Sequence, residues 1–159
     1  MFRKAALTAA LTAMIALGAA PAFAGPAETA FLQKLNSTWS GKGKLSGAES
    51  GAIACKIVFT AGGKSTKYQG RCNIPDMAQQ AFSGSISYND KAKRYEARSV
   101  GGTVPGVRKG DKLVFRSSSK SIGGTATSTM TISPGSLVVD FALVDKEGGK
   151  TTSRITFSR

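Results

Sequence analysis

The stretch GAIACKIVFTAGGKSTKYQGRCNI, residues 51–74, decides the fold class of this chain. Apolar and polar residues alternate on both sides of a Gly-Gly turn, which is the pattern of a β-hairpin. In an antiparallel hairpin, opposed residues have a constant index sum and point to the same face. A sum of 127 places Phe59 opposite Tyr68 and Cys55 opposite Cys72. The stretch therefore predicts a hairpin in which the two cysteines can form a disulfide bond.

A disulfide is favoured over a redox-active cysteine pair. The chain has two cysteines, and an even number in an exported protein is typical of a structural bridge. The alternative, a redox pair, usually takes the form C-x-x-C, whereas Cys55 and Cys72 are 17 positions apart. We expect the bridge to lie near one end of the hairpin.

The same alternation continues through most of the chain, and turn residues recur at intervals of 8–12 positions. Short connections join each expected strand to the next. The fold class predicted is all-β: an up-and-down antiparallel meander barrel of about 8–10 strands with a short N-terminal helix. A closed barrel is favoured over an open sandwich because closure removes exposed strand edges. The helix is expected at 26–35 and the strands at 38–46, 52–60, 65–73, 81–88, 94–100, 103–108, 112–119, 122–132, 136–144 and 150–158.

Constant index sums predict further registers. They place an apolar or aromatic residue opposite another in most hairpins. The expected pairs are Trp39 with Phe59, Tyr88 with Tyr95, Val107 with Leu113 around a turn, Ile132 with Leu137, and Phe141 with Ser153.

The first 24 residues have the pattern of a secretory signal peptide. Arg3 and Lys4 precede an apolar run that ends in Pro21-Ala22-Phe23-Ala24, an A-x-A cleavage site. The run is too short for a spanning helix, which needs about 20 apolar residues. We expect residues 1–24 to be removed, leaving 25–159 as a single β-barrel domain without a transmembrane segment. The Ala-rich leader favours a bacterial periplasm, with an extracellular location as the alternative.

Composition argues against catalysis. The chain has no histidine, which removes the most common general base and metal ligand. Its nine acidic residues are scattered and form no convergent pair for acid–base work. The sequence accordingly predicts no catalytic residue, no metal site, no cofactor and no enzymatic activity.

The two ends of the predicted barrel differ in character. The end toward the helix collects large apolar side chains, which predicts a plugged base. At the opposite end the inward residues are mostly small or hydroxylic, the layout of a barrel that holds a small ligand in its mouth. The alternative is a narrow barrel whose small residues let the walls meet. The candidate ligand-binding residues are Phe82, Ser99, Thr103, Ser117, Ser128 and Ser153.

Positive charge is expected on the outside of the barrel. The full chain has a formal net charge of +13, and loss of Arg3 and Lys4 with the leader leaves +11. An anionic envelope surface is a candidate partner, although surface lysines also keep sheets soluble. Nucleic acid is disfavoured because no aromatic residue alternates with the outward cations. The candidate anionic-surface residues are Lys42, Lys44, Lys56, Lys67 and Arg71.

The triplet Ser37-Thr38-Trp39 follows the short helix and opens the first strand, and in this it resembles the lipocalin and calycin group. Those barrels begin with Gly-x-Trp; Ser37 stands where they have Gly. The resemblance implies a barrel with Trp39 packed under its base and a late arginine, here Arg154 or Arg159, stacked on that ring. It also implies a ligand cavity, but it carries no catalytic residue. The fatty-acid-binding branch places two helices after its first strand, and this chain has no room for them.

Two functions follow from these features. The first is an exported, non-enzymatic barrel that binds a small apolar or amphipathic ligand. The alternative is a basic envelope-associated protein with no internal ligand, which contacts anionic lipid, lipopolysaccharide or a partner protein.

Overall fold

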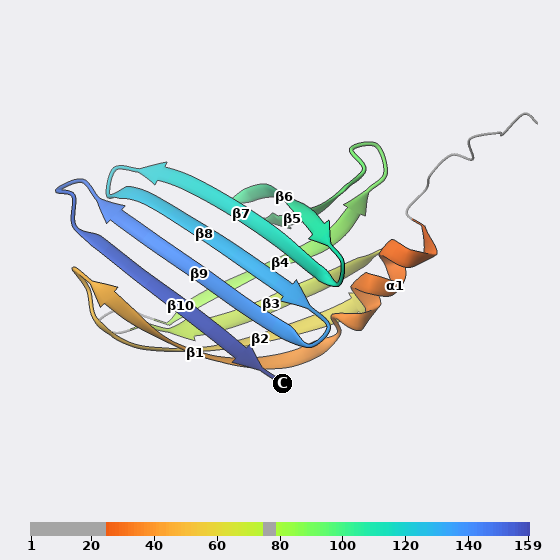
Figure 1. Ribbon diagram of the computed structural model, residues 1–159, viewed down its shortest axis with the longest axis horizontal. Helices are drawn as coiled ribbons and strands as arrows, with labels where there is room; N and C mark the ends of the chain where they lie inside the picture. Colours follow the sequence, from red (N-terminus) through yellow and green to blue (C-terminus); the bar gives the residue numbers. More distant parts are fainter. Residues whose placement is uncertain (1–24, 75–78) are drawn as a thin grey trace, which may run out of the picture.

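The computed structural model describes residues 25–74 and 79–159; the predicted signal peptide, residues 1–24, lies outside them. One helix precedes a run of strands that alternate in direction (Figure 1). The elements are α1 (Pro26–Lys34), β1 (Ser37–Gly47), β2 (Gly51–Gly62), β3 (Ser65–Asn73), β4 (Gln80–Asn89), β5 (Arg94–Ser99), β6 (Gly102–Lys109), β7 (Lys112–Ser121), β8 (Gly124–Ser133), β9 (Ser136–Asp145) and β10 (Lys150–Ser158).

The strands form a closed barrel in meander order, which confirms the predicted fold class. Each strand pairs with its sequence neighbours, and β1 pairs antiparallel with β10 from Ser40↔Ser158 to Gly47↔Thr151. An even number of alternating strands allows this antiparallel closure. The sheet consequently has no terminal strand with an exposed edge.

Most predicted registers are confirmed. Cys55 lies opposite Cys72 and the two form a disulfide bond. The hairpins β4–β5, β8–β9 and β9–β10 also have the expected pairs. The β1–β2 register is wrong by two residues, since Trp39 faces Ile57 rather than Phe59. The reason is a tight connection, in which Gly47 and Gly51 take positive φ angles of 120° and 148°. A shift of two keeps every side chain on its predicted face.

The face assignment of β6 is wrong. Val107 was expected to face Leu113, but it pairs with Val114 and is 54% exposed. Thr103 pairs with Arg98 on the outer face, while Val104 and Gly106 point inward. Valines occupy both alternating sets of this strand, so the apolar pattern alone did not decide between them. The interior at this position accepts Gly106 because the Phe115 ring of the next strand fills the space in front of it.

Helix α1 closes one end of the barrel and confirms the predicted plugged base. Gly25 precedes it as the N-cap, Pro26 occupies its first turn, and Lys34 lies in its last turn, as the helix dipole favours. Phe31, Leu32 and the following Leu35 are buried under the strands. The helix lies against β2, β3 and β4 at that end (Figure 1).

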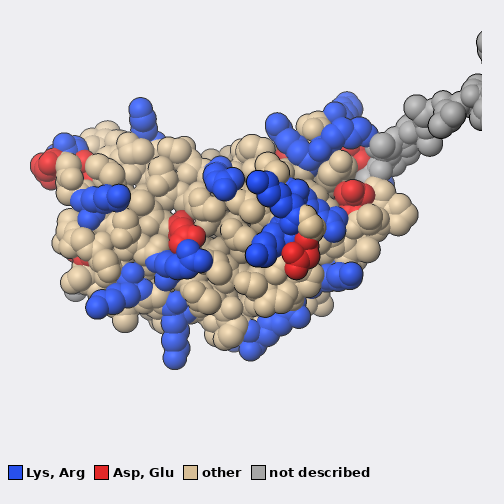
Figure 2. All heavy atoms as spheres, in the orientation of Figure 1, with Lys and Arg blue, Asp and Glu red and all other residues tan. Residues whose placement is uncertain are grey.

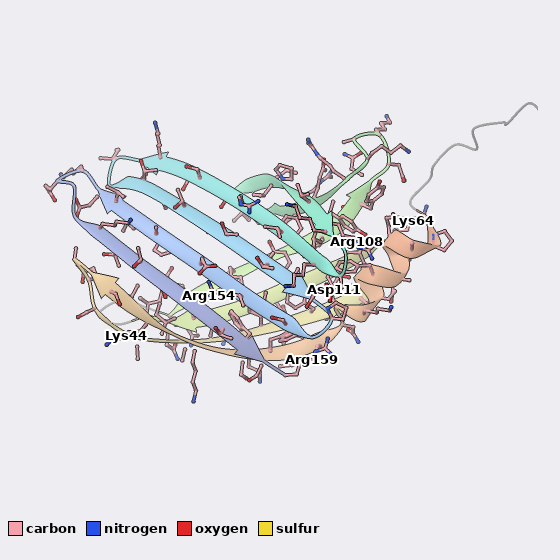
Figure 3. The ribbon with its side chains drawn as sticks, viewed as in Figure 1. Lys44, Lys64, Arg108, Asp111, Arg154 and Arg159 are labelled. Carbon is pink, nitrogen blue, oxygen red and sulfur yellow. A yellow bond between two sulfur atoms is a disulfide. The ribbon has the colours of Figure 1, made fainter. Side chains whose placement is uncertain are left out.

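Two arginines complete the base from outside. Arg159 lies 4.7 Å over the Trp39 ring and donates to the Lys34 carbonyl at 3.3 Å, so the arginine expected on the tryptophan is Arg159. Arg154, the other candidate, pairs with Asp140 at 2.9 Å, well along β10 (Figure 3). Arg108 lies 4.4 Å over the Phe31 ring. These contacts fasten α1 to β6 through Arg108, and α1 and Trp39 to the segment after β10 through Arg159.

Aromatic rings lie over glycines of the neighbouring strand on the inner face. The cross-strand pairs are Gly41↔Phe157, Gly70↔Phe82, Gly84↔Tyr68 and Gly106↔Phe115. In each pair, a Cβ built on the glycine would collide with the partner ring. The missing side chain thus lets the ring lie along the wall rather than project across the barrel.

Replacing Gly84 with alanine tests this packing. The new methyl group would meet the Arg98 carbonyl and the Tyr68 ring, so we expect Gly84→Ala to lower the free energy of unfolding by about 1–3 kcal/mol. The matched control is Gly135→Ala, where the added methyl meets nothing within 4 Å. Urea denaturation of both variants measures the difference. Equal stability of Gly84→Ala and Gly135→Ala would contradict the packing argument.

Candidate functional site

A cavity of about 310 Å³ lies inside the barrel, above the plugged base. Its walls come from most of the strands, and the Cys55–Cys72 disulfide forms part of them. The lining residues are Cys55, Ile57, Phe59, Tyr68, Cys72, Phe82, Ala97, Val104, Phe115, Ser117, Ser128, Met130, Val139, Ile155 and Phe157.

The chemistry of this lining is apolar with three hydroxyl groups. No charged side chain belongs to it. The Ser117 and Ser128 hydroxyls face each other across β7 and β8 at 2.8 Å, so each retains capacity for one further hydrogen bond. Burial raises the pKa of the Tyr68 phenol above its ordinary value, so this hydroxyl stays neutral at physiological pH. The cavity suits an apolar group that carries a neutral polar atom.

Half of the predicted ligand-binding residues line this cavity. Phe82, Ser117 and Ser128 do so, but Ser99, Thr103 and Ser153 do not. Ser99 ends β5, and its hydroxyl accepts from the Gly101 amide at 3.2 Å to form the next turn. Ser153 points inward but is buried away from the cavity, and its hydroxyl has no hydrogen-bond partner.

The cavity lies nearer the base of the barrel than the sequence predicted. Phe59, Tyr68 and Phe157 are among the large side chains expected to plug the end toward the helix, yet they also line the cavity. Met130, Val139 and Ile155 were not singled out as ligand contacts, although their alternation placed them inside. Val104 was missed because β6 was assigned the wrong face. The extent of the cavity depends on how the inward side chains of different strands meet, which alternation along a single strand does not reveal.

The barrel wall is incompletely hydrogen-bonded beside the cavity. The β6–β7 ladder runs from Lys109↔Lys112 only as far as Gly106↔Phe115. The next residue of β6 is Pro105, which has no N–H group to donate across the seam. Val104 and Ser117, on the two sides of the seam beyond that point, both line the cavity. The barrel is therefore closed at the base, whereas fewer backbone hydrogen bonds hold β6 to β7 beside the cavity.

The five residues predicted to form an anionic surface lie on the outer face of β1–β3. They pair with outward neighbours, and Lys56 lies directly opposite Arg71. None of the five takes part in the ion pairs found among residues 25–74 and 79–159. The face of β7–β10, in front in Figure 2, carries both acidic and basic side chains. Positive charge is thus least balanced on the β1–β3 side.

A second basic group surrounds Glu96 on the outer face of β5. The Arg98 guanidinium donates to Glu96 at 3.0 Å, Asn89 donates at 2.9 Å, and Arg94 donates at 3.3 Å. These hydrogen bonds, with that from Arg98 the strongest, lower the pKa of the Glu96 carboxyl. Glu96 is only 4% exposed because these side chains cover it. The cluster holds β5 to β4.

Comparison with known proteins identifies the fold. The chain matches no protein-family model and no curated protein sequence. Among solved structures it is similar to the S-type phycobiliprotein lyase CPES from Guillardia theta, with a TM-score of 0.55, 10% identity, and coverage of 80% of this chain and 89% of that one. It is also similar to Rv2717c from M. tuberculosis, with a TM-score of 0.53, 13% identity, and coverage of 85% and 99%. These likenesses support the small β-barrel fold alone; the Ser37-Thr38-Trp39 motif remains a resemblance to the lipocalin and calycin group.

The sequence predicted that the chain is not an enzyme, and this prediction is wrong because its grounds do not exclude enzymatic activity. It relied on the missing histidine and the scattered carboxylates, but a barrel of the same fold is a phycobiliprotein lyase. This fold is therefore compatible with an enzyme. At 10% identity the likeness transfers no substrate and no catalytic residue to this chain.

The described residues include no helix that is long and apolar enough to cross a membrane.

The Glu96 cluster predicts a pH dependence of stability. Because its folded-state pKa is lowered, Glu96 stabilises the fold above its ordinary carboxyl pKa of about 4.3 and loses this contribution as the pH falls through the lower folded value. We expect Glu96→Gln to reduce stability at neutral pH and to flatten the acid side of the profile. Urea midpoints measured from neutral to acidic pH provide the test. The control is Glu147→Gln, whose side chain is 77% exposed and should follow the wild type. A Glu96→Gln profile parallel to wild type would refute the assignment.

Proposed function

We propose that this chain is an exported barrel that binds a small apolar or amphipathic ligand in the cavity between its strands. The observation that carries the proposal is the 310 Å³ cavity, whose lining is apolar apart from three hydroxyls. Small-molecule sites have this character, with volumes of about 300–1,000 Å³ and few polar groups.

The size and chemistry of the cavity narrow the ligand. Its volume lies at the small end of the usual range, so it accommodates a small molecule or the apolar part of a larger one. The Ser117–Ser128 pair offers hydrogen bonds to a hydroxyl or carbonyl oxygen. A buried charge on the ligand would find no counter-ion among the lining residues. A neutral or weakly polar inserted group is favoured.

Export is supported by the leader pattern of residues 1–24 and by the Cys55–Cys72 disulfide, since such bonds persist in oxidising compartments. We place the barrel in the periplasm of a bacterium, or outside the cell. A compartment exposed to amphiphiles would supply ligands of the proposed kind.

A second function is contact with an anionic surface or partner through the outer face of β1–β3. It is favoured by the direct opposition of Lys56 and Arg71, since like charges facing each other across strands are unfavourable without a counter-ion.

Blocking the cavity tests the first function. Val139 lines the cavity, whereas Val138 lies on the opposite face of β9, so Val139→Phe and Val138→Phe form a matched pair. With the neutral fluorophore N-phenyl-1-naphthylamine, we expect Val139→Phe to weaken binding about tenfold and Val138→Phe to leave it nearly unchanged. Val139→Phe should stay within about 1 kcal/mol of wild-type stability, because an overpacked solid core would lose about 1–3 kcal/mol.

Two results would overturn the cavity function. One is fluorophore binding that both variants retain equally; the other is a strong destabilisation by Val139→Phe, which would show that the interior is solid. Native mass spectrometry of protein purified from its own host then reports whether a small molecule travels with the barrel.

A further inference from the structure

The outward side chains of β2–β5 form three transverse rows. Lys56, Arg71 and Ala81 are successive partners in the first row. Lys67, Ser85 and Arg98 are successive partners in the third row, which begins at Thr60 on β2. Between them lies a middle row of Val58, Gln69 and Ser83. Cations occupy the first and third rows, and the middle row is neutral.

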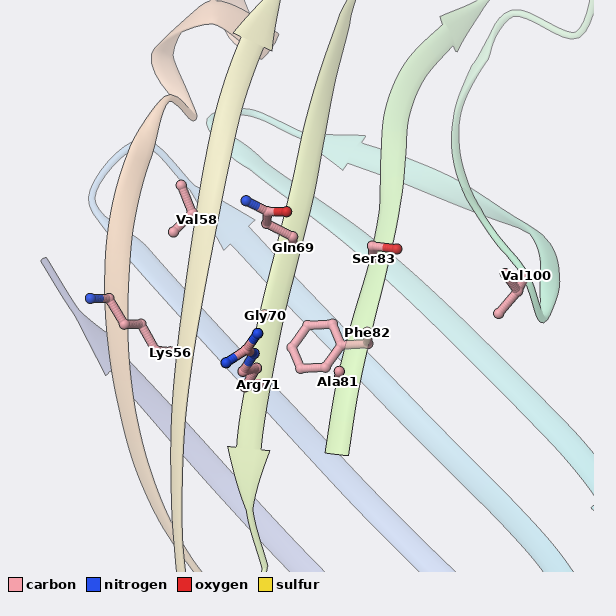
Figure 4. A pocket seen from close by; sticks show the side chains of 9 residues that line it. All are labelled: Lys56, Val58, Gln69, Gly70, Arg71, Ala81, Phe82, Ser83 and Val100. Carbon is pink, nitrogen blue, oxygen red and sulfur yellow. The ribbon is translucent and has the colours of Figure 1, made fainter. Parts of the chain in front are cut away.

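The surface is hollowed along these rows. A hollow of about 660 Å³ is lined by the first and middle rows, by Gly70 and Phe82 from the other alternating set, and by Val100 on the β5–β6 turn (Figure 4). A second hollow, of about 470 Å³, is lined by the middle and third rows and by Tyr68 and Gly84 from the other alternating set. Val58, Gln69 and Ser83 line both, so the two hollows adjoin. Small residues such as Ala81, Ser83 and Ser85 form much of the β4 side and leave the space open.

The charges along this groove are poorly balanced. The three rows contain four cations and no carboxylate. Arg98 forms an ion pair with Glu96. Lys56, Lys67 and Arg71 have no ion-pair partner within the described part of the chain. Lys56 and Arg71, as direct cross-strand partners, have Cα atoms about 5 Å apart. An anion between them would relieve their repulsion.

We propose that this groove binds a linear acidic polysaccharide. The first and third rows are four residues apart along β3, which is about 13 Å at the rise of a strand. Two acidic groups at that spacing would contact Lys56 and Arg71 at one end and Lys67 and Arg98 at the other. Between them, the Gln69 amide and the Ser83 hydroxyl would bond to sugar hydroxyls. The inference deepens the second proposed function and does not depend on the internal cavity.

The shape and composition of the groove favour this class over other polyanions. A lipid bilayer presents a flat surface, whereas the cations here border two hollows. A nucleic acid is usually held by aromatic side chains stacked on its bases. The aromatic residues that border these hollows, Phe82 and Tyr68, also line the internal cavity, and each ring lies against a glycine of the neighbouring strand rather than standing out as a stacking platform.

Titration calorimetry at low salt with a polygalacturonate oligosaccharide tests the proposal. We expect binding to the full chain that is absent for galacturonate monomer and for a neutral dextran oligosaccharide of equal length. Lys56→Gln with Arg71→Gln should weaken it about tenfold, since two exposed ion pairs are lost. The matched control is Lys109→Gln with Lys112→Gln, another directly opposed cationic pair, at the base of the barrel. Thermal unfolding of both double variants checks that they fold.

Each remaining outcome overturns a defined part of the inference. An equal loss in both double variants would mean that total charge alone attracts the polymer. Equal binding of the neutral oligosaccharide would remove the role of the cations. Sedimentation with phosphatidylglycerol vesicles, without binding of the oligosaccharide, would leave the anionic-surface function standing and refute the polysaccharide. Failure of both probes would refute both, while fluorophore binding in the cavity is measured independently.

Discussion

The placement of aromatic rings over glycines governs the interior of this barrel. A phenyl or phenol side chain that projected from every inward position would meet others across the lumen and leave no space. Here Phe82 lies over Gly70, Phe115 over Gly106 and Phe157 over Gly41, each on the adjacent strand. The rings therefore cover backbone that would otherwise be bare and still leave a cavity between the walls. Close packing along the wall and an open centre are two consequences of one arrangement.

The base explains why the cavity is closed at one end only. Leu32 and Leu35 are fully buried beneath the strands, and the Leu32 carbonyl accepts a hydrogen bond from the buried Thr66 hydroxyl at 2.8 Å. Arg159 covers Trp39 from the last residue of the chain. The first and last segments thus meet at the same end. No comparable cluster of large buried side chains closes the opposite end within the described residues, where Ser117, Ser119 and Ser121 are exposed.

Sequence alternation was sufficient for the barrel but not for the whole site. In β2 and β3 the apolar residues occupy one alternating set, and the Cys55–Cys72 register followed directly. In β6, valines on both sets concealed which face was inward, so Thr103 was misplaced and Val104 was missed. Ser99 and Ser153 point inward as expected, but neither lines the cavity. The Ser99 hydroxyl is engaged in a turn hydrogen bond, and Ser153 is buried away from the cavity. The cavity depends on the orientation of rings such as Phe82, Phe115 and Phe157 against neighbouring strands, a tertiary property that no single strand specifies.

The period of two also separates most residues of the two candidate sites. Along β3, Cys72 lines the cavity while Gln69 and Arg71 line the outer groove. Along β2, Ile57 lines the cavity and Lys56 borders the groove. One pair of strands thus presents an apolar surface inward and a cationic surface outward, with only the backbone sheet between them. Phe82 and Tyr68 line both the cavity and an outer hollow, so the two sites are tested separately with residues that belong to one site alone, such as Val139 inside and Lys56 outside.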